Sequence, residues 1–93
     1  MGVFRKIKQL SGGASPELLE HGRLGRGVVV DVEPNLTVEV RLDDEPPYLA
    51  RCHQHLPDEM LDRLVPGQTT VAVRVNANDY EDVAIDFSTP PPP

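Results

Sequence analysis

The feature of the sequence that most constrains the fold is a two-residue alternation of apolar and polar side chains, which recurs five times after residue 23. Successive side chains of an extended strand point to opposite faces, so this period predicts strands with one buried and one wet face. The expected strands cover residues 24–33, 36–42, 48–54, 69–75 and 82–87. Their inward faces are predicted to carry Val28, Val30 and Val32, then Leu36, Val38, Val40 and Leu42, then Val71, Val73 and Val75, and finally Val83, Ile85 and Phe87.

Two loops predict how the first three strands pair. Val32 and Leu36 can share the core face if they pair across a three-residue loop, in which Asn35 suits the left-handed conformation such loops require. The acidic turn after the second strand is expected to place Glu39 opposite Arg51 on the outer face. The hydrophobic and charge patterns therefore indicate the same register.

Helices are predicted before the first strand and between the third and fourth. Ser15 and Pro16 are suited to the N-cap and first position of one short helix, and another short, amphipathic helix is expected over residues 3–10. Pro57 starts the helix after the third strand. The order strand-strand-strand-helix-strand-strand is that of the OB-fold, so we expect a mainly β protein, a small five-stranded antiparallel barrel with short N-terminal helices. An SH3-like barrel or an open sheet capped by helices is the alternative.

The chain is expected to divide into three parts. Residues 1–23 form an N-terminal amphipathic helical segment, residues 24–88 the barrel, and residues 89–93 a disordered polyproline tail. Two interpretations of residues 3–10 remain open. Their apolar face, with Phe4, covers one end of the barrel as a plug, or the segment is an anchor for a partner or an anionic membrane surface through Phe4, Arg5, Lys6 and Lys8.

Composition restricts the function classes. The chain has 15 acidic and 9 basic side chains, a formal charge of −6, which disfavours nucleic acid as a partner. Cys52 is the single cysteine, so an intrachain disulfide is excluded and a cytoplasmic, reducing location is expected. The N-terminus lacks the continuous apolar core of a secretory signal, and no apolar run is long enough to span a membrane. No cofactor is predicted.

Three short motifs mark turns and strand starts behind the basic N-terminal segment: Gly25-Arg26-Gly27, Pro46-Pro47-Tyr48 and Pro66-Gly67. With these motifs, the span from Met1 to Phe87 resembles a set of short hypothetical proteins of high-GC bacteria. Seven Arg against two Lys side chains fit a GC-rich coding sequence. The resemblance implies a small OB-like β-barrel. These proteins have no assigned function, so no functional residue is carried over.

The densest group of metal-ligating residue types is Cys52-His53-Gln54-His55. On a strand, His53 and His55 would project from one face, as a two-histidine metal site needs, and Asp58 or Glu59 could supply a third ligand. The alternative is a solvated face that Arg51 shares.

The outer face of the second and third strands is a second candidate site, because OB-type barrels commonly bind ligands there and in the flanking loops. The residues expected to contact a ligand are Arg41, Arg51, His53 and Tyr80. A single-stranded nucleic acid would need stacking aromatic side chains over a positive groove, and this face has no aromatic residue of its own.

Catalytic groups are scarce, since Cys52 is expected to point into the core, where a thiol is unreactive. The sequence therefore predicts a non-enzymatic binding or protein-interaction module, with a protein partner or a homo-oligomer. A small-ligand or metal-binding protein using the outer face around His53 and His55, and a single-stranded nucleic-acid-binding OB-type domain, are the alternatives.

Overall fold

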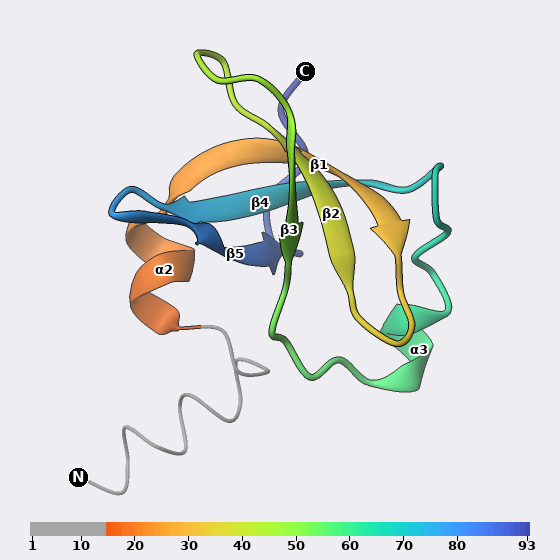
Figure 1. Cartoon of the computed structure of the whole chain (residues 1–93). Coiled ribbons are helices and arrows are strands. Elements are labelled where there is room, and N and C mark those ends of the chain that lie inside the picture. The colour runs from red at the N-terminus through yellow and green to blue at the C-terminus, as the bar shows by residue number, and fades with distance from the viewer. Residues whose placement is uncertain (1–14) are drawn as a thin grey trace, which may run out of the picture.

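The computed structural model describes residues 15–93, in which two short helices accompany five strands (Figure 1). The elements are α2 (Pro16–His21), β1 (Arg23–Asp31), β2 (Thr37–Arg41), β3 (Tyr48–Arg51), α3 (Asp58–Leu61), β4 (Thr70–Asn76) and β5 (Asp79–Asp86). The helix expected over residues 3–10 lies outside the described residues. From β1 onward, the predicted order of three strands, a helix and two strands is confirmed.

One antiparallel sheet contains all five strands in the order β3-β2-β1-β4-β5. The sheet curls into a half-barrel, and an isolated parallel bridge between Cys52 and Val83 brings its two outer strands together. The mainly β architecture predicted from the alternation, with five antiparallel strands in one barrel-like sheet, is confirmed.

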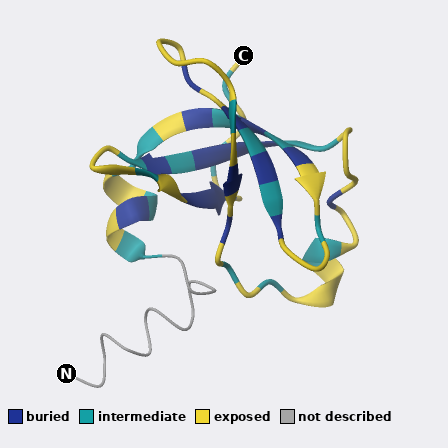
Figure 2. Cartoon of the chain, viewed as in Figure 1, coloured by how far each residue is buried: buried dark blue, intermediate teal, exposed yellow. Residues whose placement is uncertain are grey.

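The core lies on the inner face of this curled sheet (Figure 2). Its fully buried side chains include Val38 and Val40 of β2, Val73 and Val75 of β4 and Ile85 of β5, all on faces predicted to be buried. Phe87 was expected to follow them inward, and this prediction was wrong, since its side chain is 45% exposed. Strand β5 ends at Asp86, so the alternation no longer applies to the next residue.

The buried face of β1 differs from the prediction. Gly25, Gly27 and Val29 face the core, whereas Val28 is half-buried and Val30 is 37% exposed. The reason is space: a Cβ added to Gly27 would lie 2.7 Å from a methyl group of Val73 on the neighbouring strand. A bulge after Val29 then changes the alternation again.

The loops also differ from the prediction. Among residues 15–93, no residue other than glycine has a positive φ, so Asn35 is not left-handed, and the turn contains a cis Glu33–Pro34 peptide instead. The register of β2 and β3 is displaced by two residues, and Glu39 lies opposite Leu49. Glu39 pairs with Arg41 of its own strand, at 2.7 Å between Oε1 and Nη2, rather than with Arg51.

Side chains close the gap between β3 and β5. The Tyr48 hydroxyl donates to the carbonyl oxygen of Tyr80 at 2.7 Å, and their rings stack with centroids 6.2 Å apart. The side chain of Gln54 forms the two hydrogen bonds to Ile85 that the backbone of a neighbouring strand would form. Its amide nitrogen donates to the Ile85 carbonyl at 3.1 Å, and its amide oxygen accepts from the Ile85 N–H at 2.7 Å. These side-chain contacts therefore hold β3 and β5 together, although the two strands share no continuous ladder of backbone hydrogen bonds.

Replacing Gln54 by Ala is expected to lower the free energy of unfolding by about 2 kcal/mol, because it leaves both backbone groups of Ile85 without their partner. Urea denaturation measures the change. The matched control is Gln54→Glu, which keeps the acceptor for the N–H but loses the donor. An unfolding midpoint unchanged in Gln54→Ala would contradict the closing role.

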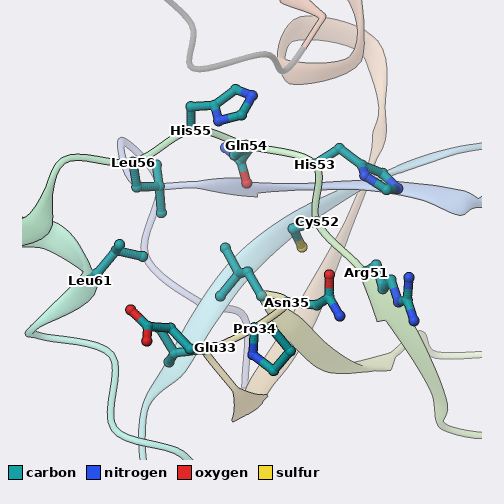
Figure 3. Close-up of a pocket in the computed structure, with 12 residues that line it drawn as sticks. Glu33, Pro34, Asn35, Arg51, Cys52, His53, Gln54, His55, Leu56 and Leu61 are labelled. Carbon is teal, nitrogen blue, oxygen red and sulfur yellow. The ribbon is translucent and has the colours of Figure 1, made fainter.

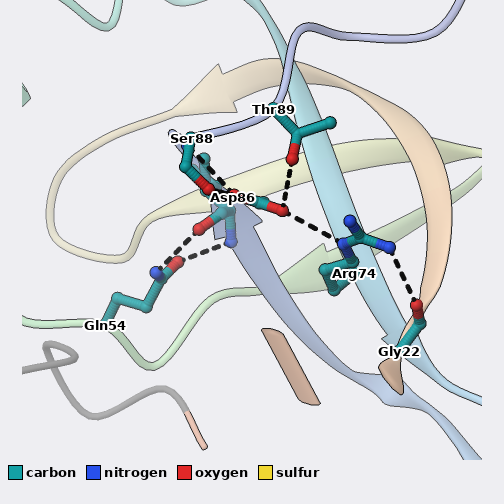
Figure 4. A network of polar contacts seen from close by, with 7 residues as sticks. Gly22, Gln54, Arg74, Asp86, Ser88 and Thr89 are labelled. Atoms are coloured by element: carbon teal, nitrogen blue, oxygen red, sulfur yellow. Dashed lines mark hydrogen bonds and ion pairs between the residues drawn. The ribbon is translucent and has the colours of Figure 1, made fainter. Parts of the chain in front are cut away.

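A buried carboxylate fixes the chain where β5 ends (Figure 4). Asp86 is 6% exposed and accepts hydrogen bonds from the backbone N–H and hydroxyl of Ser88, the hydroxyl of Thr89 and Nε of Arg74. Arg74 also donates to the carbonyl oxygen of Gly22 at 3.3 Å, so the network ties β4 and β5 to the end of α2. Burial opposes ionisation of Asp86, but the hydrogen bonds from Ser88, Thr89 and Arg74 outweigh it and hold its pKa at about 2.

The two ends of the described chain lie on the sheet. Ser15 is the N-cap of helix α2 as predicted, and its hydroxyl accepts a hydrogen bond from the N–H of Leu18. The helix buries Leu18 against Ala84 of β5. In the tail, Pro92 and Pro93 border a small cavity beside the β1–β2 pair.

Candidate functional site

A groove of about 490 Å³ lies beside the β1–β2 connection (Figure 3). Residues 32–36 line one side, and residues 51–56 together with Leu61 line the other. We call this the β1–β2 groove. It lies between the loop joining the first two strands and the segment leaving β3, a region where OB-type barrels bind ligands.

The floor of the β1–β2 groove is apolar. Leu36 and Cys52 are buried, and Val32, Leu56 and Leu61 are partly buried against the main core. Apolar side chains of a bound molecule can pack on this floor without leaving backbone polar groups unpaired, because the residues on its two sides already form backbone hydrogen bonds with each other. The N–H of Cys52, for example, donates to the Leu36 carbonyl at 2.8 Å.

The two rims of the groove are polar and exposed. Figure 3 shows His53 and His55 on the side opposite Glu33 and Pro34. Arg51 completes the basic rim, and its side chain forms no ion pair with any residue in the range 15–93. The groove thus offers one edge with an arginine and two histidines and one edge with a single carboxylate.

The structure brings together only part of the predicted ligand-binding set. Arg51 and His53 line the β1–β2 groove. Arg41 lies toward the other end of β2 and pairs with Glu39, while Tyr80 stacks on Tyr48 beside the gap between β3 and β5. These two residues therefore do not contribute to the groove.

The predicted metal ligands His53 and His55 both line the groove, but β3 ends at Arg51, before either of them. Within residues 15–93, no group of three or more His, Cys, Asp and Glu side chains is placed to hold a metal ion. The third ligand expected from Asp58 or Glu59 is thus not brought to the two histidines.

Cys52 faces the core, as its position in the alternation predicts, and is 5% exposed. Burial raises the pKa of its thiol to about 12. At neutral pH this sulfur is therefore a protonated, apolar part of the groove floor rather than a nucleophile.

Some residues of the groove were not predicted as site residues, notably Glu33, Asn35 and Leu56. Glu33 and Asn35 could have been predicted from the sequence, because they lie in the loop between the first two strands and that loop binds ligands in OB-type barrels. The candidate contacts Phe4, Arg5, Lys6 and Lys8 lie outside the described residues.

Comparisons with protein-family models, with curated proteins and with solved structures each returned no match. The resemblance to hypothetical proteins of high-GC bacteria therefore stays a prediction. In the part of the chain described, residues 15–93, no helix has the length and apolar character needed to cross a membrane.

Proposed function

We propose that this protein is a non-enzymatic binding module that holds an extended segment of a protein partner in the β1–β2 groove. The observation that carries the proposal is the groove itself, an apolar floor between two exposed polar rims. In protein interfaces an apolar centre buries side chains of the partner, whereas the polar rim orients the partner and shields that centre from water. The single cysteine supports a cytoplasmic location, and the Arg-rich basic set supports a bacterial source.

The partner segment is expected to carry apolar and acidic side chains. Arg51 can bind a carboxylate through two parallel hydrogen bonds, which gives both energy and orientation. His53 and His55 add donors along the same rim, whereas the opposite rim has only Glu33. A basic segment would find one favourable contact there, and an acidic one would find several.

A small carboxylate ligand is the second candidate occupant. Its support is the size of the groove, since about 490 Å³ falls within the range of small-molecule sites. Single-stranded nucleic acid has less support, because residues 32–36 and 51–56 contain no Phe, Tyr or Trp on which bases could stack. A second copy of the chain is the remaining occupant to test.

Reversing the charge at Arg51 is expected to reduce capture of the partner strongly. The experiment immobilises the full chain, incubates it with lysate of the organism that encodes it and quantifies retained proteins by mass spectrometry. Arg51→Glu should reduce the specific partner by about tenfold or more, because an interface Arg that binds a carboxylate often contributes more than 1.4 kcal/mol.

The matched control is Arg63→Glu, the same change at an exposed residue outside the groove. It should retain the partner at the wild-type level. Equal capture by the wild-type chain and Arg51→Glu would overturn the proposal. Sedimentation of the purified chain separates self-association from binding of another protein.

A further inference from the structure

A second groove, lined mainly by apolar side chains, adjoins the β1–β2 groove at residues 54–56, which line both. Its apolar lining is Leu19 of α2, Leu56, Pro57, Met60 of α3, Ile85 of β5 and Phe87 after β5, and its volume is about 300 Å³. We call it the Phe87 groove. An aromatic side chain left 45% exposed above an apolar cavity can still be covered by other apolar groups.

Exposed carboxylates flank the residues of this groove in the sequence. Glu20 follows Leu19 on α2, while Asp58, Glu59 and Asp62 surround Met60. The residues from 15 onward contain six basic and fifteen acidic side chains, a formal charge of −9. A covering segment should therefore be apolar on one face and basic on the other.

The chain supplies such a segment close by. Residues 3–10 contain three basic and no acidic side chains, interspersed with Val3, Phe4, Ile7 and Leu10. They join the described fold at Ser15, which borders a small cavity together with Gln54. Gln54 also lines the Phe87 groove, and the connection of residues 11–14 can span up to about 14 Å.

We propose that residues 3–10 bind the Phe87 groove of their own chain, with Phe4, Ile7 and Leu10 against Phe87 and the basic side chains toward the carboxylates of α2 and α3. This contact lies next to the partner site proposed for the β1–β2 groove, because residues 54–56 line both grooves. It favours the plug over the membrane anchor, the two interpretations that the sequence leaves open.

The test uses the full chain with Phe87→Trp, which introduces the one tryptophan of the protein. Quenching of its fluorescence by neutral acrylamide reports whether the ring is covered. Ile7→Asp should lower the docked-to-undocked ratio by about 30-fold, the equivalent of roughly 2 kcal/mol for one buried aliphatic side chain, and make the indole accessible.

Two controls make the result specific. Gln9→Asp adds the same charge on the polar face of the segment and should leave the indole of F87W largely protected. Leu49→Trp, on the outer face of β3, should be accessible with or without Ile7→Asp. Circular dichroism verifies that each variant remains folded.

Three outcomes would overturn the proposal. In the first, the indole of F87W is equally accessible with and without Ile7→Asp. In the second, its protection is lost on dilution, so that the segment comes from a second copy. In the third, the indole is accessible in the unmodified N-terminal background and the chain binds vesicles of anionic lipid, as expected for an anchor.

Discussion

Replacing Asp86 by Asn is expected to lower the free energy of unfolding by about 3 kcal/mol, because it removes the charge that Arg74 neutralises inside the fold. The carboxylate accepts four hydrogen bonds, whereas an amide has a single acceptor oxygen and two donors with no acceptor to reach. For a domain with a total stability of roughly 5–15 kcal/mol, this is a large fraction. Chemical denaturation followed by circular dichroism measures it.

The control for this prediction is Ser88→Ala, which removes one neutral donor and should cost about 1 kcal/mol. A loss in Asp86→Asn no larger than in Ser88→Ala would show that the ion pair with Arg74 contributes little.

The same residue predicts a pH dependence. The folded-state pKa of Asp86, about 2, lies below its unfolded value of ~3.9, so folding favours the ionised form. Its contribution to stability is complete above the unfolded value and is lost as the pH falls from about 4 toward 2. The difference in stability between the wild type and Asp86→Asn should therefore shrink over this range. A constant difference would contradict the low pKa.

Replacing Gly27 by Val is expected to destabilise the fold by about 2–3 kcal/mol. The new side chain would enter the core at the place where even an added Cβ would lie 2.7 Å from Val73 Cγ1, and overpacking of this kind displaces strands or strains rotamers. Thermal and urea unfolding give the change in stability.

Val73→Ala provides the matched test of this clash, because it removes the methyl groups that the new side chain would meet. The double variant Gly27→Val/Val73→Ala should be more stable than the sum of the two single effects implies. If the destabilisations of the two single variants simply add in the double variant, the clash with Val73 is not the reason that the fold requires glycine at position 27.

The sequence predicted the class and order of elements because the alternation on β2, β4 and β5 is regular. It failed on β1, where Gly25 and Gly27 occupy buried positions and give no apolar signal. Three consecutive valines, 28–30, fit either phase of the alternation, so the pattern alone could not select Val29 as the buried one. Contact with Val73, a residue far along the chain, decides the phase.

The candidate site was predicted in part for a related reason. Arg51 and His53 were identified by residue type, and both line the β1–β2 groove. Arg41 was included because it lies on the outer face of the second and third strands, and Tyr80 because it was expected to approach from the loop before the last strand. In the structure Arg41 pairs with Glu39 and Tyr80 stacks on Tyr48, and neither lines the groove. The buried network around Asp86 was not predicted, since Arg74 and Asp86 are brought together by the pairing of β4 with β5.

Site-specific photo-crosslinking in the native cell shows directly whether a partner occupies the β1–β2 groove. A photoreactive amino acid at Asn35, on the rim of the groove, is predicted to give a discrete adduct that disappears when Arg51→Glu is added. The same amino acid at Leu49, which is 64% exposed on the outer face of β3, should not give it. An adduct formed from position 49 and not from position 35 would contradict the account.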